Sequence, residues 1–308
     1  MNFFMIFSKV SVIFLLILVG FALTRTHIIS QKSRSDLTNM LLYAFLPCAL
    51  IKAFQVPFNK LNFISGLKIA LIMTLVYTSA TVIAWYLAKF FTKDLQKRDI
   101  FTIGMVLPNV TFMGYPVIES VLGPEYLFYI VMAVIPFEII AWSLMSNIVI
   151  KNGNNPPTVS VFKRLITSPP IIGITLSVIL HVLPFQLPDV VATTIDHLAG
   201  AMTPVAMIIV GMSLASTNIK HLVMNPYLYL ASAIKLLVFP GLLLVILKAL
   251  GLSGPTLIIP VALLAMPTAG YTTIIASKYG SDATFAAEFI SLCTLLSLLT
   301  IPIIVSLL

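Results

Sequence analysis

Long apolar stretches alternate with short polar ones along the whole chain. The polar stretches, such as "TRTHIISQKSRSD", "TKDLQKRD" and "KNGNNPPTVSVFKR", have the composition of loops. An α-helix needs roughly 20 apolar residues to cross a bilayer, and the apolar stretches are about that long. The pattern therefore predicts an all-α polytopic membrane protein with ten transmembrane helices. These are expected at about 7–24, 36–54, 63–90, 99–122, 125–150, 168–184, 193–216, 226–250, 255–277 and 283–307.

The composition agrees with a membrane protein and excludes a soluble one. Of the 308 residues, 59% are hydrophobic and 9% are charged, whereas soluble domains carry about 25% charged residues. Ten spans joined by short loops leave no room for a soluble enzyme or sensor domain. Lys9 and the apolar run after it resemble a signal peptide, but no convincing cleavage site follows. We therefore predict that this run is the first helix.

The positions of Lys and Arg predict the orientation of the helices. The net charge of +8 is interpreted as the charge of cytoplasmic loops, and no nucleic-acid partner is expected. The loops after helices 1, 3, 5, 7 and 9 hold 12 of the 18 Lys and Arg residues, and the opposite side holds 5. Loops rich in Lys and Arg stay in the cytoplasm. We therefore expect a multi-pass protein of the cell membrane with both termini extracytoplasmic.

The two halves of the chain resemble each other. "AFLPCALI" and "AMTPVAMI" place Pro47 and Pro204 157 residues apart, and "MVLPNVTFMGY" and "LLAMPTAGYTT" place Pro108 and Pro267 159 residues apart. The nearly constant offset predicts two five-helix repeats, 1–150 and 168–308, joined by a short cytoplasmic linker at 151–167. Because five is odd, the second repeat enters the membrane from the opposite face. Inverted repeats of this kind are typical of secondary transporters.

The prolines in helices 4 and 9 predict a binding site. Proline removes a backbone donor and breaks a helix, and an unwound stretch at membrane depth is tolerated only where it lines protein or a cavity. Each break exposes a half-helix N-terminus that favours an anion. Asn109, Thr111 and Thr268 are good N-cap residues. The alternative is a pair of structural kinks. The predicted substrate-binding residues are Pro108, Asn109, Val110, Thr111, Gly114, Pro267, Thr268, Ala269, Gly270 and Tyr271.

Two ionisable residues within spans are candidates for coupling or charge compensation, because a charge in the membrane is costly unless it is used or paired. Glu138 lies in the middle of helix 5 and is expected to carry a proton or help bind a cation. Lys235 in helix 8 is expected to neutralise an anionic substrate, pair with a carboxylate or extend to the interface. No catalytic or metal-binding motif is present in the sequence. We predict no enzymatic activity and no cofactor, with H⁺ or Na⁺ as the expected coupling ion.

Several stretches resemble the auxin efflux carrier family in its short bacterial form. They are "DLTNMLLYAFLPCALIKAF", "NVTFMGYPVIESVLGPE", "LAGAMTPVAMIIVGMSLAS" and the segment from "MPTAGYTT" to the C-terminus. The resemblance implies a scaffold of helices 1, 2, 6 and 7 and a moving transport domain of helices 3–5 and 8–10. It also implies crossing helices 4 and 9, a homodimer, elevator-like motion, and carboxylates such as malate or malonate as substrates.

The resemblance assigns the crossover to Pro108 and Asn109 in one half and to Pro267 and Thr268 in the other. Thr268 departs from the plant pattern, which has asparagine there, and "KNGNNPPTVSVFKR" replaces the long central loop of plant members. The leading hypothesis is a secondary carrier of small organic anions. The alternatives are a sodium-coupled symporter of a larger amphipathic anion, such as a bile-acid-like compound, and a membrane sensor that binds a ligand without transporting it.

Overall fold

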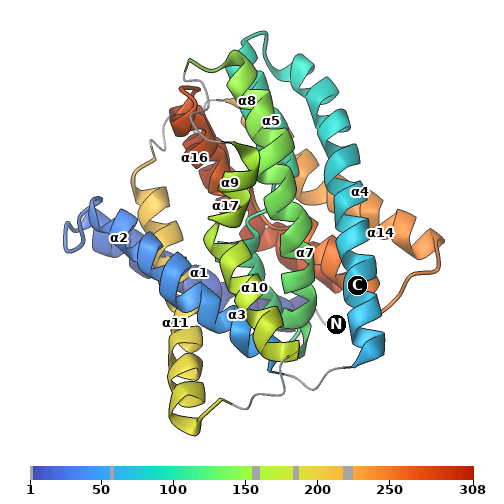
Figure 1. Ribbon diagram of the computed structural model, residues 1–308. Helices are drawn as coiled ribbons and strands as arrows, with labels where there is room; N and C mark the ends of the chain where they lie inside the picture. Colours follow the sequence, from blue (N-terminus) through green and yellow to red (C-terminus); the bar gives the residue numbers. More distant parts are fainter. Residues whose placement is uncertain (1–2, 56–58, 155–159, 183–186, 218–224) are drawn as a thin grey trace.

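The computed structural model describes residues 3–55, 59–154, 160–182, 187–217 and 225–308 (Figure 1). In these residues the chain is helical, without a β-strand, as the apolar pattern predicts. Part of the predicted linker, residues 155–159, and the end of the sixth predicted span, residues 183–184, lie outside the described residues.

Seven helical segments of the described chain are long and apolar enough to cross a membrane. Four are uninterrupted: α1 (Phe3–Arg25), α4 (Lys60–Phe91), α11 (Asp189–Ala215) and α17 (Ala283–Ser306). Three are continuous helices that contain a widened turn. These are α2 (Ser33–Met40), η1 (Leu41–Phe45) and α3 (Leu46–Phe54); η3 (Pro124–Tyr126), α7 (Leu127–Ile140), η4 (Ala141–Met145) and α8 (Ser146–Asn152); and α13 (Pro226–Ala233), η5 (Ile234–Val238) and α14 (Phe239–Ala249).

The remaining helices are shorter. α9 (Val161–Ile166) lies within the predicted linker and precedes α10 (Pro169–Val182). The fourth predicted span is divided into α5 (Leu95–Val106), η2 (Val110–Gly114) and α6 (Tyr115–Val121), and the ninth into α15 (Pro255–Leu264) and α16 (Tyr271–Lys278). Both predicted breaks are therefore present in the structure.

Prolines explain three of the widened turns. The π-helical turns η1, η2 and η5 each end two residues before a proline, at Pro47, Pro116 and Pro240. A proline has no N–H, and its ring displaces a carbonyl of the preceding turn. A π turn accommodates this displacement while the helix continues.

The helices pack closely against one another, and α1 also contacts α17. α1 lies along α11, and α3 packs against α10 and α11. Gly20 and Gly211 bring α1 and α11 into backbone contact, since a Cβ at Gly20 would lie 2.2 Å from the Ile208 carbonyl oxygen. Elsewhere α4 packs against α5 and α7, α14 against α15, and α16 against α17. Figure 1 shows α1 and α11 on the left of the view and α4 and α14 on the right.

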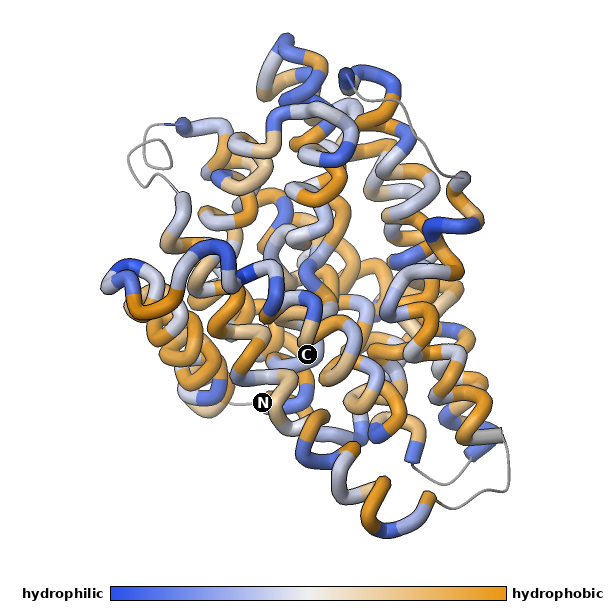
Figure 2. Tube along the Cα trace, turned by 60° about the vertical axis from the view of Figure 1, so that its left-hand side comes forward, coloured by the Kyte–Doolittle hydropathy of each residue, from blue (hydrophilic) through white to orange (hydrophobic). Residues whose placement is uncertain are grey.

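The outer surface is apolar, as a lipid-facing surface must be. Leu67, Leu71 and Leu75 form an exposed stripe along one face of α4. Figure 2 shows hydrophobic residues along the long helices, with hydrophilic residues gathered mainly at their ends and connections.

Candidate functional site

The two helix breaks meet in the interior of the molecule. Pro108 and Thr268 form an isolated antiparallel bridge. The Asn109 N–H donates to the Pro267 carbonyl over 2.7 Å, and the Ala269 N–H donates to the Leu107 carbonyl over 2.9 Å. Buried backbone groups need hydrogen-bond partners, and each break supplies partners for the other.

Asn109 is the N-cap of the turn that follows the first break. Its side-chain Oδ1 accepts a hydrogen bond from the Phe112 N–H at 3.2 Å. An amide has separate donor and acceptor ends, so this bond fixes which end is which. The Nδ2 donors make no hydrogen bond to another described residue, and Asn109 lines a cavity beside the crossing. The amide therefore presents donors to that cavity.

The prediction that Thr268 is an N-cap is wrong. Its hydroxyl donates to the Gly104 carbonyl at 2.8 Å and lies 3.4 Å from Cys293 Sγ, in a fully buried position. The last carbonyls of a helix have no partner within the helix, and Thr268 satisfies one at the end of α5. Gly270 is the N-cap of α16 instead. Thr111 lies within η2 and is not an N-cap either.

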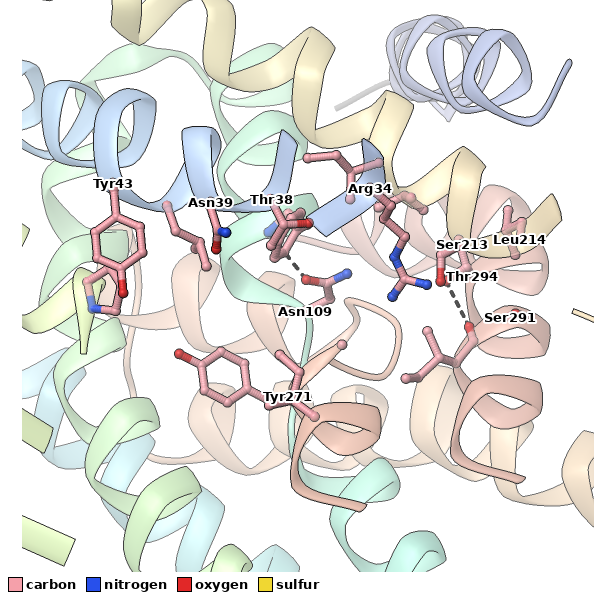
Figure 3. Close-up of a pocket in the computed structure, with 18 of the residues that line it drawn as sticks. Arg34, Thr38, Asn39, Tyr43, Asn109, Ser213, Leu214, Tyr271, Ser291 and Thr294 are labelled. Atoms are coloured by element: carbon pink, nitrogen blue, oxygen red, sulfur yellow. Dashed lines mark hydrogen bonds between the residues drawn. The ribbon is translucent and has the colours of Figure 1, made fainter. Parts of the chain in front are cut away.

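The cavity has a volume of about 230 Å³ and lies between α2, α11, the two breaks and α17. Figure 3 shows polar side chains on several sides of it. Its lining residues are Arg34, Thr38, Asn39, Leu42, Tyr43, Asn109, Phe112, Trp142, Pro169, Ile209, Val210, Ser213, Leu214, Gly270, Tyr271, Ile274, Ile290, Ser291 and Thr294.

Arg34 supplies a cationic side chain to the cavity, and the sequence analysis did not identify it. The predicted second span began at residue 36, so Arg34 was counted only as a loop charge. In the structure α2 begins at Ser33, and Arg34 and Thr38 lie one helical turn apart on the cavity side. Figure 3 shows the Arg34 guanidinium and the Asn109 amide facing the same space. If the second span is taken to begin three residues earlier, at Ser33, the i, i+4 spacing places Arg34 and Thr38 on the same face of the helix.

Hydroxyl groups on α11 and α17 complete the polar lining. Ser213 and Ser291 border the cavity with Thr294. The Ser291 hydroxyl lies 2.7 Å from that of Thr217, and the Thr294 hydroxyl donates to the Ile290 carbonyl over 2.8 Å. The first bond joins the chain just after α11 to α17, whereas the second lies within α17.

Three of the ten predicted binding residues line the cavity: Asn109, Gly270 and Tyr271. Gly114 serves packing, because a Cβ there would lie 3.0 Å from the Leu263 side chain. The others surround the crossing without being lining residues; they are Pro108, Val110, Thr111, Pro267, Thr268 and Ala269.

Glu138 and Lys235 are fully buried and lie outside the cavity lining. Glu138 accepts hydrogen bonds from Trp142, Ser168 and Tyr271. Lys235 Nζ donates to the Leu264 carbonyl at 3.2 Å, at the C-terminal end of α15. The last carbonyls of a helix lack partners within the helix, so this bond stabilises the end of the helix that leads into the second break.

The whole sequence matches a known family. A family model described as "Membrane transport protein" matches residues 5–305. The chain belongs to this family. The match confirms the resemblance to the auxin efflux carriers, since both refer to the same family.

Two archaeal members of the membrane transport protein family are similar to this chain over almost their full length. One is named an uncharacterized transporter of Methanocaldococcus jannaschii; it is 24% identical over 299 residues, which cover 96% of each chain. The other is an uncharacterized transporter of Methanothermobacter thermautotrophicus, 26% identical over 297 residues and 94% of each chain. This membrane transport protein is therefore similar in sequence, over 94% or more of its length, to proteins named as transporters.

Proposed function

We propose that this protein is a secondary carrier of small organic anions, with a mono- or dicarboxylate such as malate or malonate as the substrate. The observation that carries the proposal is the pairing of Arg34 with Asn109 at one cavity beside two crossed helix breaks.

The chemistry of the cavity favours a carboxylate. The Arg34 guanidinium supplies charge and a planar set of donors that match carboxylate geometry. The Asn109 Nδ2 group supplies a fixed donor, because Oδ1 is held by the Phe112 N–H. The side chains of Leu42, Phe112 and Leu214 provide an apolar wall for a short carbon chain.

The size of the cavity favours a small substrate. Pockets for drug-sized ligands measure about 300–1,000 Å³, whereas this cavity measures about 230 Å³. A malonate-sized molecule is compatible with this volume. A bile-acid-like anion is larger, so the small-anion hypothesis is the better supported one.

The proposed mechanism is elevator-like alternating access. In this proposal the ten spans are α1, α2–α3, α4, α5–α6, α7–α8, α10, α11, α13–α14, α15–α16 and α17, arranged as two inverted repeats. Spans 1, 2, 6 and 7 form a scaffold that also mediates a homodimer, and the other six move. The packing of α1 on α11 and of α3 on α10 and α11 supports this division. The cavity supports it as well, because α2 and α11 line one part and the breaks and α17 another.

The proposed orientation makes this the inward-facing state. Arg34 lies near the start of α2, next to a loop predicted to be cytoplasmic from its positive charge. Substrate would then enter or leave the cavity from the cytoplasmic side.

Uptake in proteoliposomes tests the proposal. We expect radiolabelled malonate or malate to be taken up by the wild type, and Asn109→Ala and Arg34→Gln to lower uptake at least tenfold. Loss of one hydrogen bond to a charged group costs about 1.5–3 kcal/mol, which corresponds to about 10- to 100-fold in affinity.

Arg25→Gln is the matched control, since Arg25 ends α1 next to the same loop but does not line the cavity. It should transport like the wild type. Wild-type uptake by Asn109→Ala and Arg34→Gln, at equal protein abundance, would contradict the site assignment.

A further inference from the structure

Glu138 lies at the centre of a hydrogen-bond cluster that touches the substrate cavity. Its side chain is fully buried, and its three recorded partners are uncharged donors from three parts of the chain. Tyr271 and Trp142 belong to this cluster and also line the cavity. The cluster therefore connects a buried carboxyl group with the cavity, and Tyr271 is the hydroxyl in that connection.

The two oxygens of the Glu138 carboxyl group have different surroundings. Oε2 accepts from the Trp142 indole N–H at 3.0 Å and from the Ser168 hydroxyl at 2.8 Å. Among the described residues, only the Tyr271 hydroxyl donates to Oε1, at 2.8 Å. An indole N–H can only donate, so Oε2 remains an acceptor in either protonation state. A proton on Glu138 is therefore accommodated at Oε1, which faces Tyr271.

The Tyr271 hydroxyl has one hydrogen, and it can donate that hydrogen in only one direction at a time. While Glu138 is ionised, the hydrogen points to Oε1, and the phenolic oxygen presents lone pairs elsewhere. Those lone pairs repel a carboxylate in the cavity. When Oε1 carries a proton it donates to the phenolic oxygen, and the Tyr271 hydrogen becomes available to a ligand.

We propose that Glu138 is the proton-binding site of this carrier and that Tyr271 couples its protonation to binding of a carboxylate in the cavity. This inference rests on the proposed function and specifies its coupling ion. Protonation of Glu138 raises the affinity for the anion, and bound anion raises the affinity of Glu138 for the proton, because such coupling is reciprocal. Anion and proton then move together.

The position of Tyr271 suits a dicarboxylate. Figure 3 shows the Tyr271 hydroxyl toward the Tyr43 end of the cavity, with the Arg34 guanidinium toward the other end. One carboxylate binds Arg34 and Asn109, and the second receives the Tyr271 hydrogen. The proton on Glu138 offsets the charge of this second carboxylate.

The surroundings of Glu138 favour binding of a proton over binding of a sodium ion. Three donors already occupy its oxygens, so a sodium ion would have to displace them. α15 carries no charged residue, nor does α10 over its apolar part, Pro169–Leu180.

Several titratable groups on the other neighbouring elements have their own contacts. Lys52 on α3 pairs with Asp196 at 3.1 Å, and Arg164 on α9 bonds to the Tyr279 hydroxyl. Lys278 on α16 lies 5.6 Å from the centre of the Trp142 ring. Tyr77 on α4 packs against Phe137, and Glu119 on α6 bonds to Thr203. The other titratable residues are Cys48 on α3, Lys60, Lys68, Tyr86 and Lys89 on α4, Tyr115 on α6, Glu125 and Tyr126 on η3, Tyr129 on α7 and Arg34 across the cavity.

Calorimetry of the purified protein with malonate and malate tests the relay. In buffers of different ionisation enthalpy, we expect the wild type to take up about one proton per bound anion, and its affinity to fall about tenfold per pH unit above the midpoint of the transition. Glu138→Gln should bind the anion with no proton uptake and hold the high affinity as pH rises. Its amide oxygen takes the position of Oε2 and its amide nitrogen donates to Tyr271, as protonated Glu138 does.

Tyr271→Phe distinguishes the relay from a purely electrostatic effect of Glu138. We expect it to bind more weakly at low pH and to lose proton uptake, although Glu138 is intact. Tyr115→Phe is the matched control, because Tyr115 also follows a helix-break glycine, is buried, and has a hydroxyl with no hydrogen-bond partner among the described residues. This variant should keep the wild-type proton uptake.

The possible outcomes separate the two proposals. If the wild type binds the anion and either Tyr271→Phe or Glu138→Gln still takes up a proton on binding, the relay is overturned. The proposed carboxylate function would stand in that case. Absence of malonate and malate binding in every variant, at every pH, would overturn the proposed carboxylate function and the relay with it. The ionisation of the ligand is the same for all variants, so differences between them report the protein. If Glu138→Gln fails to fold, proton uptake by Tyr271→Phe compared with that by Tyr115→Phe still tests the relay.

Discussion

At the scale of single residues, Asn109 both caps the turn after the first helix break and lines the cavity beside it. Its carbonyl end caps η2 through the Phe112 N–H, and its amino end remains free for a ligand. A serine or aspartate would also cap the turn, but neither side chain offers fixed amide donors. In the proposed anion carrier this position requires both an acceptor and a donor, and an amide supplies both.

Gly114 and Gly270 follow the two breaks and have different surroundings, although both adopt right-handed helical backbone angles. A Cβ at Gly270 meets nothing within 4 Å, and this residue lines the cavity. A Cβ at Gly114 would press on the Leu263 side chain. The same substitution at these two positions should therefore affect different properties.

We predict that Gly270→Val weakens anion binding about tenfold or more, because its side chain occupies part of the cavity. Its melting temperature should stay close to that of the wild type. Gly114→Val should lower the free energy of unfolding by about 1–3 kcal/mol through overpacking. Calorimetric titration with malonate and thermal unfolding measure the two effects. If Gly114→Val weakens malonate binding without lowering stability, Gly114 does not pack against Leu263 as described. If Gly270→Val lowers stability without weakening binding, Gly270 does not line the cavity as described.

Sequence reasoning found the residues at the breaks but not their partners. Asn109 and Tyr271 were predicted because prolines mark the breaks and adjacent polar residues must be satisfied. Arg34 was missed because the helix boundary was placed three residues too late. Thr268 was misassigned because an N-cap pattern is local, whereas its actual acceptor belongs to Gly104, 164 residues away in the chain. Long-range partners of this kind leave no local pattern.

At the scale of helices, close approach depends on small residues. Without a hydrophobic driving force in lipid, membrane helices associate through tight packing and hydrogen bonds. On α11, a Cβ at Gly211 would lie 2.0 Å from the Ile17 carbonyl oxygen of α1. Gly200 lies on the same helix, and a Cβ there meets nothing within 4 Å.

We predict that Gly211→Ala lowers the melting temperature in detergent, with a destabilisation of about 1–3 kcal/mol, because α1 and α11 must separate. Gly200→Ala is the matched control and should be neutral or stabilise by up to about 1 kcal/mol, since alanine has the higher helix propensity. Equal melting temperatures for the two variants would show that the contact of α1 with α11 does not depend on Gly211.

Hydropathy predicted the positions of the apolar helices more reliably than their π turns and breaks. The long helices follow from runs of apolar residues, but the π turns depend on how each proline is accommodated. The spans at 99–122 and 255–277 have the hydropathy of full spans, yet their helices are short because the backbone at the breaks pairs across the molecule. That pairing depends on two segments 159 residues apart.

At the scale of the whole molecule, the direction in which the cavity opens depends on which ends of the helices face the cytoplasm. α4 is a single helix of 32 residues, with Lys60 exposed at its start and Lys93 exposed just beyond its end. A helix of this length is about 48 Å long, enough to cross the bilayer. The two lysines therefore lie on opposite sides of the membrane.

We predict that Lys93 and the Arg34 end of the cavity face the cytoplasm, because the more positive loops remain there. In intact cells, a membrane-impermeant maleimide should label Lys60→Cys, and it should label Lys93→Cys only after permeabilisation. The wild-type protein, which contains Cys48 and Cys293, measures the background. The reverse labelling pattern would place the cavity on the extracytoplasmic side. The present conformation would then be outward-facing, and the proton that accompanies the anion would enter Glu138 from outside the cell.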